Sequence, residues 1–324
     1  PARCLQRHSR GMVGGWHPQA VRAVFLAGAF LFLGEFRRLR RRALRSARCT
    51  LVVKLGGSAV TDKTCFETVR VAALRETACA LSRSPLLAGT VLVHGAGSFG
   101  HFHAREHGVS RGTAHSAFSW RGFALTRSSV TRLNGIVLTA LLEQGIAACG
   151  LPPFPRWVLC GGALTDTDAP LGEVRSLLSR GVVPVLHGDA VFDEARGAAI
   201  LSGDTLVEEL CAALRPTRAV FLTDVAGIFD RPPGEDGAAL LRRIVVGPSG
   251  EVVDLPQMRT AAHDVTGGVA AKLSAAARVA AGGVPVVIVE AGTVHAEAAL
   301  RGEWPERCTV VTGRGETRHT RACA

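Results

Sequence analysis

Hydrophobic and polar positions alternate in blocks along residues 50–324. Five short apolar runs, rich in β-branched residues, have the pattern of buried strands. They are Thr50–Leu55, Thr90–Val93, Val182–Leu186, Ala219–Leu222 and Val284–Val289. Helical periodicity fills the intervals between these runs, at Phe66–Leu81, Phe118–Gln144, Asp204–Leu214 and Val269–Ala281. Strands that alternate with helices predict an α/β fold around a mostly parallel sheet.

Length and hydrophobic content set the size of the core. The chain has 324 residues, of which 47% are hydrophobic, enough for one large domain or two modest ones. The Pro- and Gly-rich segment Arg231–Gly237 predicts a loop. No repeat and no long linker interrupts the sequence, so nothing in it requires two independent domains.

Charge is distributed unevenly along the chain. Residues 1–49 contain 11 Arg and one acidic residue, Glu35, a net charge of +10. Residues 50–324 contain 27 basic and 26 acidic side chains, a net charge of +1. Because the α/β region is almost neutral, the overall charge of +11 does not indicate a nucleic-acid partner.

Residues 1–49 form an Arg-rich extension that we expect to be a targeting or disordered segment. Its apolar run, Ala23–Gly34, is twelve residues long, whereas a membrane span needs about 20, so no stable membrane span is expected. The composition resembles an organellar transit peptide; a signal anchor or untranslated upstream sequence stays an alternative. The predicted location is intracellular: the cytoplasm, or a plastid or mitochondrion if the extension is a transit peptide.

Cysteine usage agrees with a reducing compartment. The nine cysteines are scattered and form no CxxC pair, which favours free thiols over a disulfide framework. Because cysteine spacing indicates no zinc site, the sequence predicts no protein-bound metal.

Glycine follows three of the predicted strands. The loops are Gly56-Gly57-Ser58, His94-Gly95-Ala96-Gly97 and His187-Gly188-Asp189. Glycine at the carboxyl end of a parallel strand lets backbone N–H groups and a helix N-terminus face an anion. A single loop of this kind is more often a tight turn, but three of them predict a phosphate site at one edge of the sheet.

Common nucleotide-binding motifs are excluded. Gly95–Gly100 matches GxGxxG, but no acidic residue between Glu106 and Glu143 is present to hold a ribose, so a dinucleotide enzyme is not supported. The chain also lacks GxxxxGK[ST], HRD and DFG, which excludes P-loop enzymes and protein kinases.

Lysine is rare and lies close to glycine pairs. Only Lys54, Lys63 and Lys272 occur among 38 basic residues. A compact ammonium on a flexible stem can follow a phosphoryl group during transfer, whereas Arg suits a fixed fork. The placement favours phosphoryl transfer; chance proximity in a glycine-rich chain is the alternative.

Taken together, these motifs resemble the isopentenyl phosphate kinases over about residues 50–315. The motifs, in the family's order, are Lys54–Ser58, Thr61–Lys63, Gly95–His101, His187–Asp189, Ser202–Asp204, Thr223–Phe229, and Asp264–Gly268 with Lys272. The resemblance implies an amino-acid-kinase fold, a three-layer αβα sandwich, over residues 50–317, with a tail at 318–324. The acceptor half would span about residues 50–190 and the nucleotide half about 191–317.

The resemblance also implies the activity and the residues that carry it. ATP, with Mg²⁺, would phosphorylate isopentenyl monophosphate or a related prenyl monophosphate in a homodimeric enzyme that feeds isoprenoid synthesis. Lys54, Lys63 and His101 would be catalytic. The ATP-binding positions would be Lys54, Gly56, Gly57, Ser58, Asp224, Gly227, Gly268 and Lys272. The acceptor-binding positions would be Gly95, Ala96, Gly97, His101, Gly188 and Asp189.

The match to the family is incomplete at four places. Ala226 and Phe229 stand where an acid and a tyrosine are common, His187 replaces a common tyrosine, and Gly150–Leu159 fits poorly. For the apolar tail of the acceptor, the nearest candidates are Phe99, Phe102 and the helix at 118–142.

Two alternatives to this function stay open. One is another kinase of the same fold, acting on a phosphonate, a carboxylate or UMP. The other is a nucleotide-binding regulator without activity.

Overall fold

A computed structural model describes residues 48–254 and 267–314, and the side chains of residues 254–272 are not described. The predictions for the Arg-rich extension and for the tail at 318–324 therefore lie outside the described residues. The α/β region is built on a nine-stranded sheet of order β13-β12-β15-β14-β11-β1-β4-β8-β5. The strands are β1 Leu51–Leu55, β4 Thr90–His94, β5 Ala148–Gly150, β8 Val183–His187, β11 Arg218–Thr223, β12 Arg243–Val246, β13 Val252–Asp254, β14 Val286–Glu290 and β15 Thr309–Gly313.

The sheet is mostly parallel, as the sequence predicts. Six of its eight neighbouring pairs are parallel, and the antiparallel pairs are β12–β13 and β14–β15. All five predicted strands are present, within two residues of the expected ends. Strand β1 lies at the centre, with Val53 opposite Val220 of β11 and Leu92 of β4.

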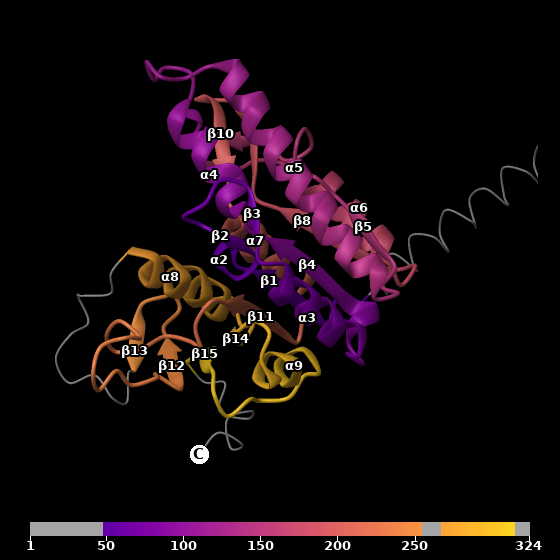
Figure 1. Ribbon diagram of the computed structural model, residues 1–324, viewed down its shortest axis with the longest axis vertical. Helices are drawn as coiled ribbons and strands as arrows, with labels where there is room; N and C mark the ends of the chain where they lie inside the picture. The colour runs from indigo at the N-terminus through magenta and orange to yellow at the C-terminus, as the bar shows by residue number, and fades with distance from the viewer. Residues whose placement is uncertain (1–47, 255–266, 315–324) are drawn as a thin grey trace, which may run out of the picture. The chain divides into compact units, whose positions relative to one another are not determined.

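Helices cover both faces of the sheet and complete three layers (Figure 1). Alternate residues of β1 face opposite layers: Val52 packs with one cluster of buried residues, and Leu51 and Val53 pack with the other. Helices α6, α7 and α8 pack on the first face, and α3, α5 and α9 on the second. Their bounds are α3 Val71–Ser82, α5 Trp120–Glu143, α6 Asp168–Leu178, α7 Gly203–Leu214, α8 Gly267–Ala281 and α9 Val294–Leu300.

One predicted helix begins later than expected. The helix predicted over Phe66–Leu81 is α3, which starts at Val71, because the preceding residues form strand β3 (Thr68–Val69). This strand pairs with β2 (Thr61–Asp62) in an antiparallel hairpin. The β-branched Thr68 and Val69 suit an extended conformation, so local propensity and pairing override the helical spacing.

A small second sheet was not predicted. Its order is β10-β9-β6-β7, and β9 pairs with β10 in an antiparallel hairpin. The strands are β6 Leu159–Cys160, β7 Ala163–Leu164, β9 Asp189–Asp193 and β10 Gly197–Leu201. Beside it lie α4 (Gly97–Glu106) and the 3₁₀ turn η2 (Val109–Arg111), and Figure 1 shows α5 next to α4. Ala104, Val109, Phe123 and Ala198 form the buried contact between these elements.

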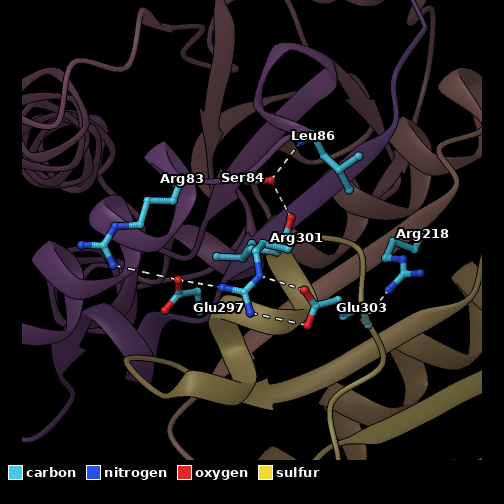
Figure 2. A network of polar contacts seen from close by, with 8 residues as sticks. Arg83, Ser84, Leu86, Arg218, Glu297, Arg301 and Glu303 are labelled. Carbon is cyan, nitrogen blue, oxygen red and sulfur yellow. Dashed lines mark hydrogen bonds and ion pairs between the residues drawn. The ribbon is translucent and has the colours of Figure 1, made fainter. Parts of the chain in front are cut away.

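A polar network joins α3 to α9 on the second face (Figure 2). Ser84 is buried, and its hydroxyl donates to the Leu300 carbonyl at 2.6 Å and accepts from the Leu86 backbone N–H at 3.1 Å. Arg301 pairs with Glu297 at 2.8 Å and with Glu303 at 2.9 Å. The buried hydroxyl is the part of this network that stabilises packing most, because exposed ion pairs contribute little.

Within residues 48–254 and 267–314, no helix combines the length and the apolar character that crossing a bilayer requires. The seven cysteines within these ranges are all free thiols.

Candidate active site

Three glycine loops lie side by side at the carboxyl ends of β1, β4 and β8, and the first of them also contacts the end of β11. Backbone hydrogen bonds from the first glycine of each loop extend the pairing of these strands by about one residue. Gly56 N–H donates to the Leu222 carbonyl at 2.9 Å, Gly95 N–H to Leu55 at 2.9 Å, and Gly188 N–H to His94 at 3.0 Å. The predicted convergence of the loops at one edge is therefore confirmed.

Two of these loops touch through their backbones. A Cβ atom added at Gly57 would lie 2.9 Å from the Cα and N atoms of Gly97, and one added at Gly95 would lie 2.8 Å from Gly57 N. Gly97 also has a φ of +50°, in the left-handed region that favours glycine. Side chains at these positions would push the first and second loops apart.

Short helices begin directly at the loops. Helix α2 (Gly57–Val60) follows β1, and α4 begins at Gly97 after β4. Thr61 fixes the two together, because its hydroxyl donates to the Gly57 carbonyl at 2.7 Å and accepts from Ser98 N–H at 3.0 Å. Free N–H groups at a helix start favour an anion, so both loops present donors suited to phosphate.

Lys54 lies on β1 with its ammonium at this edge of the sheet. Its side chain is 10% exposed, forms an ion pair with Asp204 and lies over the Phe221 ring, with Nζ 4.9 Å from the ring centre. Asp204 is in the first turn of α7, which is capped by Ser202. The carboxylate therefore holds a buried ammonium in a fixed position.

Asp204 was not among the predicted site residues. It lies 150 residues from Lys54 in the sequence, and only the pairing of β1 between β4 and β11 brings α7 to it. Its place in Ser202–Asp204, directly after a glycine at a helix start, was the signal available in the sequence.

The predicted nucleotide-side positions have different surroundings. Ser58 donates to Asp224 at 2.9 Å, which joins the first loop to the end of β11. Gly227 is packed against β15: a Cβ there would lie 2.4 Å from Thr309 Oγ1, so packing alone explains this glycine. Gly268 and Lys272 lie in α8, but their side-chain surroundings are outside the described residues. Roles in ATP binding stay predictions for all of them.

His101 and Lys63 approach one another across the second loop. His101 is on α4, and Lys63 is exposed on the turn after β2. Burial lowers the pKa of His101 first, and the positive charge of Lys63 lowers it further. The structure thus brings together two of the three predicted catalytic side chains.

A cavity of about 310 Å³ opens beside His101, between α4, α5 and the β9–β10 hairpin. Its walls mix backbone, apolar groups and cationic side chains. They are formed by Ala96, Gly100, His101, Ala104, Arg105, Gly108, Ser110, Arg111, His115, Thr126, Val130, Gly188, Asp189 and Ile200. Four predicted acceptor-binding residues, Ala96, His101, Gly188 and Asp189, lie in this wall.

Asp189 faces the cavity but already has partners. Arg127 donates to its carboxylate at 3.3 Å, and the backbone N–H groups of Ala190 and Phe154 donate at 2.9 and 3.4 Å. Burial raises the pKa of Asp189, and the charge of Arg127 opposes that rise. The Arg127 guanidinium in turn lies 4.1 Å above the Phe154 ring centre.

The expectation that Phe99 and Phe102 line the acceptor pocket is wrong. Phe99 is 2% exposed and packs in the core of the second face. Phe102 packs edge-on against Phe66, at 5.6 Å between ring centres. On α4 the aromatic positions point away from the face that carries His101. Of the predicted helix, Thr126 and Val130 do line the cavity.

A buried histidine pair lies directly below the loops. The rings of His94 on β4 and His187 on β8 stack at 5.3 Å. Burial lowers the pKa of His94 to about 3 and that of His187 to about 4, with smaller contributions from His187 and Arg127 respectively. His94 contacts Asn134 Oδ1 at 3.1 Å, and each Nδ1 contacts the following glycine carbonyl. Both rings are fully buried and neutral near pH 7, so His187 is a core residue.

Comparison with known proteins identifies the family. Residues 50–290 match the amino acid kinase family. An isopentenyl phosphate kinase from Arabidopsis thaliana is 39% identical over 311 residues, which cover 80% of this chain and 92% of the relative. An isopentenyl phosphate kinase from Methanothermobacter thermautotrophicus is 34% identical over 271 residues, which cover 82% of this chain and 99% of the relative.

A solved structure agrees with the sequence comparisons. An isopentenyl phosphate kinase structure with 30% identity has a TM-score of 0.66 and covers 81% of this chain and 99% of its own. The family match over residues 50–290 includes the glycine loops and the residues of the cavity wall. The chain therefore belongs to the amino acid kinase family and, within it, to the isopentenyl phosphate kinases.

Proposed function

We propose that this chain transfers the γ-phosphoryl group of ATP to the phosphate of isopentenyl monophosphate or a related prenyl monophosphate. The observation that carries the proposal is the cavity beside His101. Backbone groups of Ala96 and Gly188 lie near one another there, since a Cβ at Gly188 would lie 3.6 Å from Ala96 N. Ala104, Val130 and Ile200 supply an apolar wall for a short hydrocarbon tail.

The reaction brings two anions together. An ionised oxygen of the acceptor phosphate attacks the γ-phosphorus, a new P–O bond forms, and the bond to the β,γ-bridging oxygen breaks to release ADP. The attacking oxygen is already ionised, so the site needs no general base. Its task is to position the groups and to stabilise negative charge.

The side chains at the sheet edge suit that task. Lys54, on the strand that precedes the first glycine loop, is held by Asp204, and Lys63 lies near His101 on the acceptor side. We assign Lys54 and Lys63 to the transferring phosphoryl group and His101 to the acceptor phosphate. The N–H groups at the starts of α2 and α4 complete the donors.

We propose that Mg²⁺ binds together with ATP at the carboxylates of this edge, which also hold Lys54 and Ser58. Asp204 and Asp224 offer oxygen ligands that, with nucleotide phosphates, form the oxygen-only donor set that Mg²⁺ prefers. When bound, Mg²⁺ would neutralise phosphate charge.

We also propose a homodimer, in keeping with the resemblance described above.

A second candidate acceptor is a phosphonate. The same cavity wall carries Arg105, Arg111 and His115, and Arg111 contacts His115 at 2.7 Å. The two guanidinium groups, with the imidazole beside one of them, suit an acceptor with a second polar end better than they suit a hydrocarbon.

Product analysis of the full chain decides between these acceptors. The protein is incubated with ATP, Mg²⁺ and one acceptor at a time: isopentenyl phosphate, dimethylallyl phosphate, a small phosphonate, UMP or a carboxylate. Phosphorus NMR then follows the new signal of each phosphorylated acceptor, separately from the signals of ATP and ADP. We expect kcat/KM to be largest for a prenyl monophosphate. Turnover of the phosphonate alone, or of no acceptor, would contradict the proposal.

A further inference from the structure

Helix α4 carries a cluster of metal-ligating side chains on a part of its surface that the proposed reaction does not use. His103, Glu106 and His107 occupy positions i, i+3 and i+4, so they share one face of the helix. One ligand atom from each lies within 4.8 Å of the other two. His103 Nδ1 and His107 Nε2 are each 4.0 Å from Glu106 Oε2.

These distances suit a shared ion better than direct hydrogen bonds. At 4.0 Å a nitrogen and an oxygen are too far apart for a hydrogen bond. Two ligands about 2.1 Å from one tetrahedral ion would lie about 3.4 Å apart. Small side-chain rotations would therefore be enough to bring all three groups onto one cation.

Nδ1 of His103 lacks a hydrogen-bond partner within the described part of the chain. His103 Nδ1 is one of three buried side-chain atoms without a hydrogen bond among the residues that the structure describes. Its ring packs edge-on against Phe66, at 5.2 Å between centres, which limits its rotation. A buried polar atom without a partner is costly, and a coordinated cation would satisfy it.

His107 is oriented by the start of the neighbouring helix α5. His107 Nδ1 lies 3.4 Å from the hydroxyl of Ser119, which itself accepts from Gly122 N–H at 3.0 Å as the cap of α5. Gly122 permits this contact, because a Cβ there would lie 2.0 Å from His107 Cβ. When Nδ1 carries the proton, Nε2 presents its lone pair toward Glu106. A fixed second nitrogen of this kind is typical of metal-binding histidines.

The cluster is also open to an incoming ion. The Glu106 side chain is 70% exposed, whereas His103 and His107 are 20% and 21% exposed. A carboxylate at the surface and two imidazoles behind it provide an entry path and a partly enclosed site. Two nitrogens and one oxygen are the ligands of zinc and similar ions and not of Mg²⁺.

We propose that His103, Glu106 and His107 bind one divalent transition-metal ion, with Zn²⁺ as the physiological candidate and water in the fourth position. The ion would fix the last turn of α4, the helix whose first turns carry the second glycine loop and His101. The expectation of no protein-bound metal rested on cysteine spacing and did not weigh this cluster. The new site does not depend on the proposed function.

Cobalt titration tests the site without an activity assay. The full chain, prepared without a polyhistidine tag, is titrated with Co²⁺ and followed by its visible d–d absorption. We expect one equivalent to bind, to be displaced by Zn²⁺ and to resist a large excess of Mg²⁺. Stoichiometric Zn²⁺ should also raise the thermal unfolding temperature.

Matched variants assign the ligands. His103→Ala and His107→Ala should abolish the cobalt spectrum, whereas His295→Ala, on α9, should leave it unchanged. Glu106→Gln should weaken binding at least about tenfold, in line with the loss of an anionic ligand, and its exposed position leaves folding intact. Circular dichroism of the metal-free variants checks their fold.

The proposal is overturned if the wild-type chain shows no stoichiometric binding, or if the three cluster variants bind cobalt as the wild-type chain does. A thiolate-to-cobalt charge-transfer band would also overturn it, because it would place the ion on cysteine. Wild-type affinity in Glu106→Gln alone would also contradict the three-ligand site.

Discussion

His101 is the residue on which we expect the choice of acceptor to depend. It lies at the point where the second glycine loop meets the cavity, and its imidazole is close enough to Lys63 for that charge to lower its pKa. An imidazole N–H that donates to the acceptor phosphate would distinguish a phosphate acceptor from a carboxylate.

Replacing His101 should weaken acceptor use and leave ATP use largely intact. A hydrogen bond to a charged group contributes about 1.5–3 kcal/mol, so His101→Ala should lower kcat/KM for isopentenyl phosphate by roughly 10- to 150-fold. His101→Gln should restore part of the loss, because an amide can still donate. Steady-state kinetics in both substrates measures this. An equal rise in KM for ATP would place the histidine on the nucleotide side instead.

Lys63 should act mainly on the transition state. Lys63→Ala should lower kcat by about 10² or more, with a modest change in KM for ATP, as expected for one lost electrostatic donor. Arg70→Ala is the control, because Arg70 is another exposed cation close to the same hairpin. Near-normal kcat in Lys63→Ala, or an equal loss in the control, would remove Lys63 from the mechanism.

At the scale of elements, we expect the backbone contact between the first and second loops to position both phosphates. Gly57→Ala should separate the loops, because its Cβ would lie 2.9 Å from the Gly97 backbone. We expect kcat/KM to fall by about 10² or more for both substrates, since small displacements of positioning groups are costly.

A glycine in open space provides the control for that variant. Gly135 lies on α5 with no atom within 4 Å of an added Cβ. Gly135→Ala should keep full activity and raise the free energy of unfolding by up to about 1 kcal/mol. Full activity in Gly57→Ala would show that the two loops move apart without consequence.

The link between α3 and α9 should contribute measurably to stability. Ser84→Ala leaves the Leu300 carbonyl without its donor in a buried position, at a cost of about 1–3 kcal/mol in the free energy of unfolding. Ser179→Ala, an exposed serine at the end of α6, should change it by less than about 0.5 kcal/mol. Urea denaturation of both variants measures the difference; equal values would mean that the carbonyl finds another partner.

The sequence predicts the elements whose residues are buried on both faces. Strand β1 is apolar apart from Lys54 and ends at glycine, so both its extent and its loop could be predicted. The β9–β10 hairpin could not, because Asp189–Leu201 mixes polar and apolar residues and its pairing depends on a turn at Gly197. Contacts such as Lys54–Asp204 join distant segments and follow only from the strand order.

For the whole molecule, the buried histidine pair couples folding to pH. The pKa of His94 is lowered to about 3 and that of His187 to about 4, from the ordinary histidine value of 6.5. Above pH 6.5 both are neutral in the folded and unfolded chain. Below pH 6.5 the unfolded chain binds protons that the folded chain does not, so the free energy of unfolding decreases as the pH is lowered.

The expected loss is about 1.4 kcal/mol per pH unit for each histidine between pH 6.5 and about 4. His187→Asn keeps a donor for the Gly188 carbonyl and removes one titration. Its free energy of unfolding should therefore depend less steeply on pH than that of the wild-type chain. Urea denaturation at pH 7.5, 6 and 5 measures both slopes. Identical slopes would mean that His187 does not titrate on unfolding.

The contact between Gly57, Gly95 and Gly97 also limits how this protein can diversify. No side chain separates the first and second glycine loops at this contact, so their spacing is fixed by main-chain atoms that mutation cannot alter gradually. If the loops bind the two phosphates, as proposed, a change in them should disturb both substrates at once. Ala104, Val130 and Ile200, by contrast, are not among the atoms at that contact and line the cavity. Because we propose that the acceptor binds there, we expect single substitutions in the cavity wall to change acceptor preference and leave the transfer geometry unchanged.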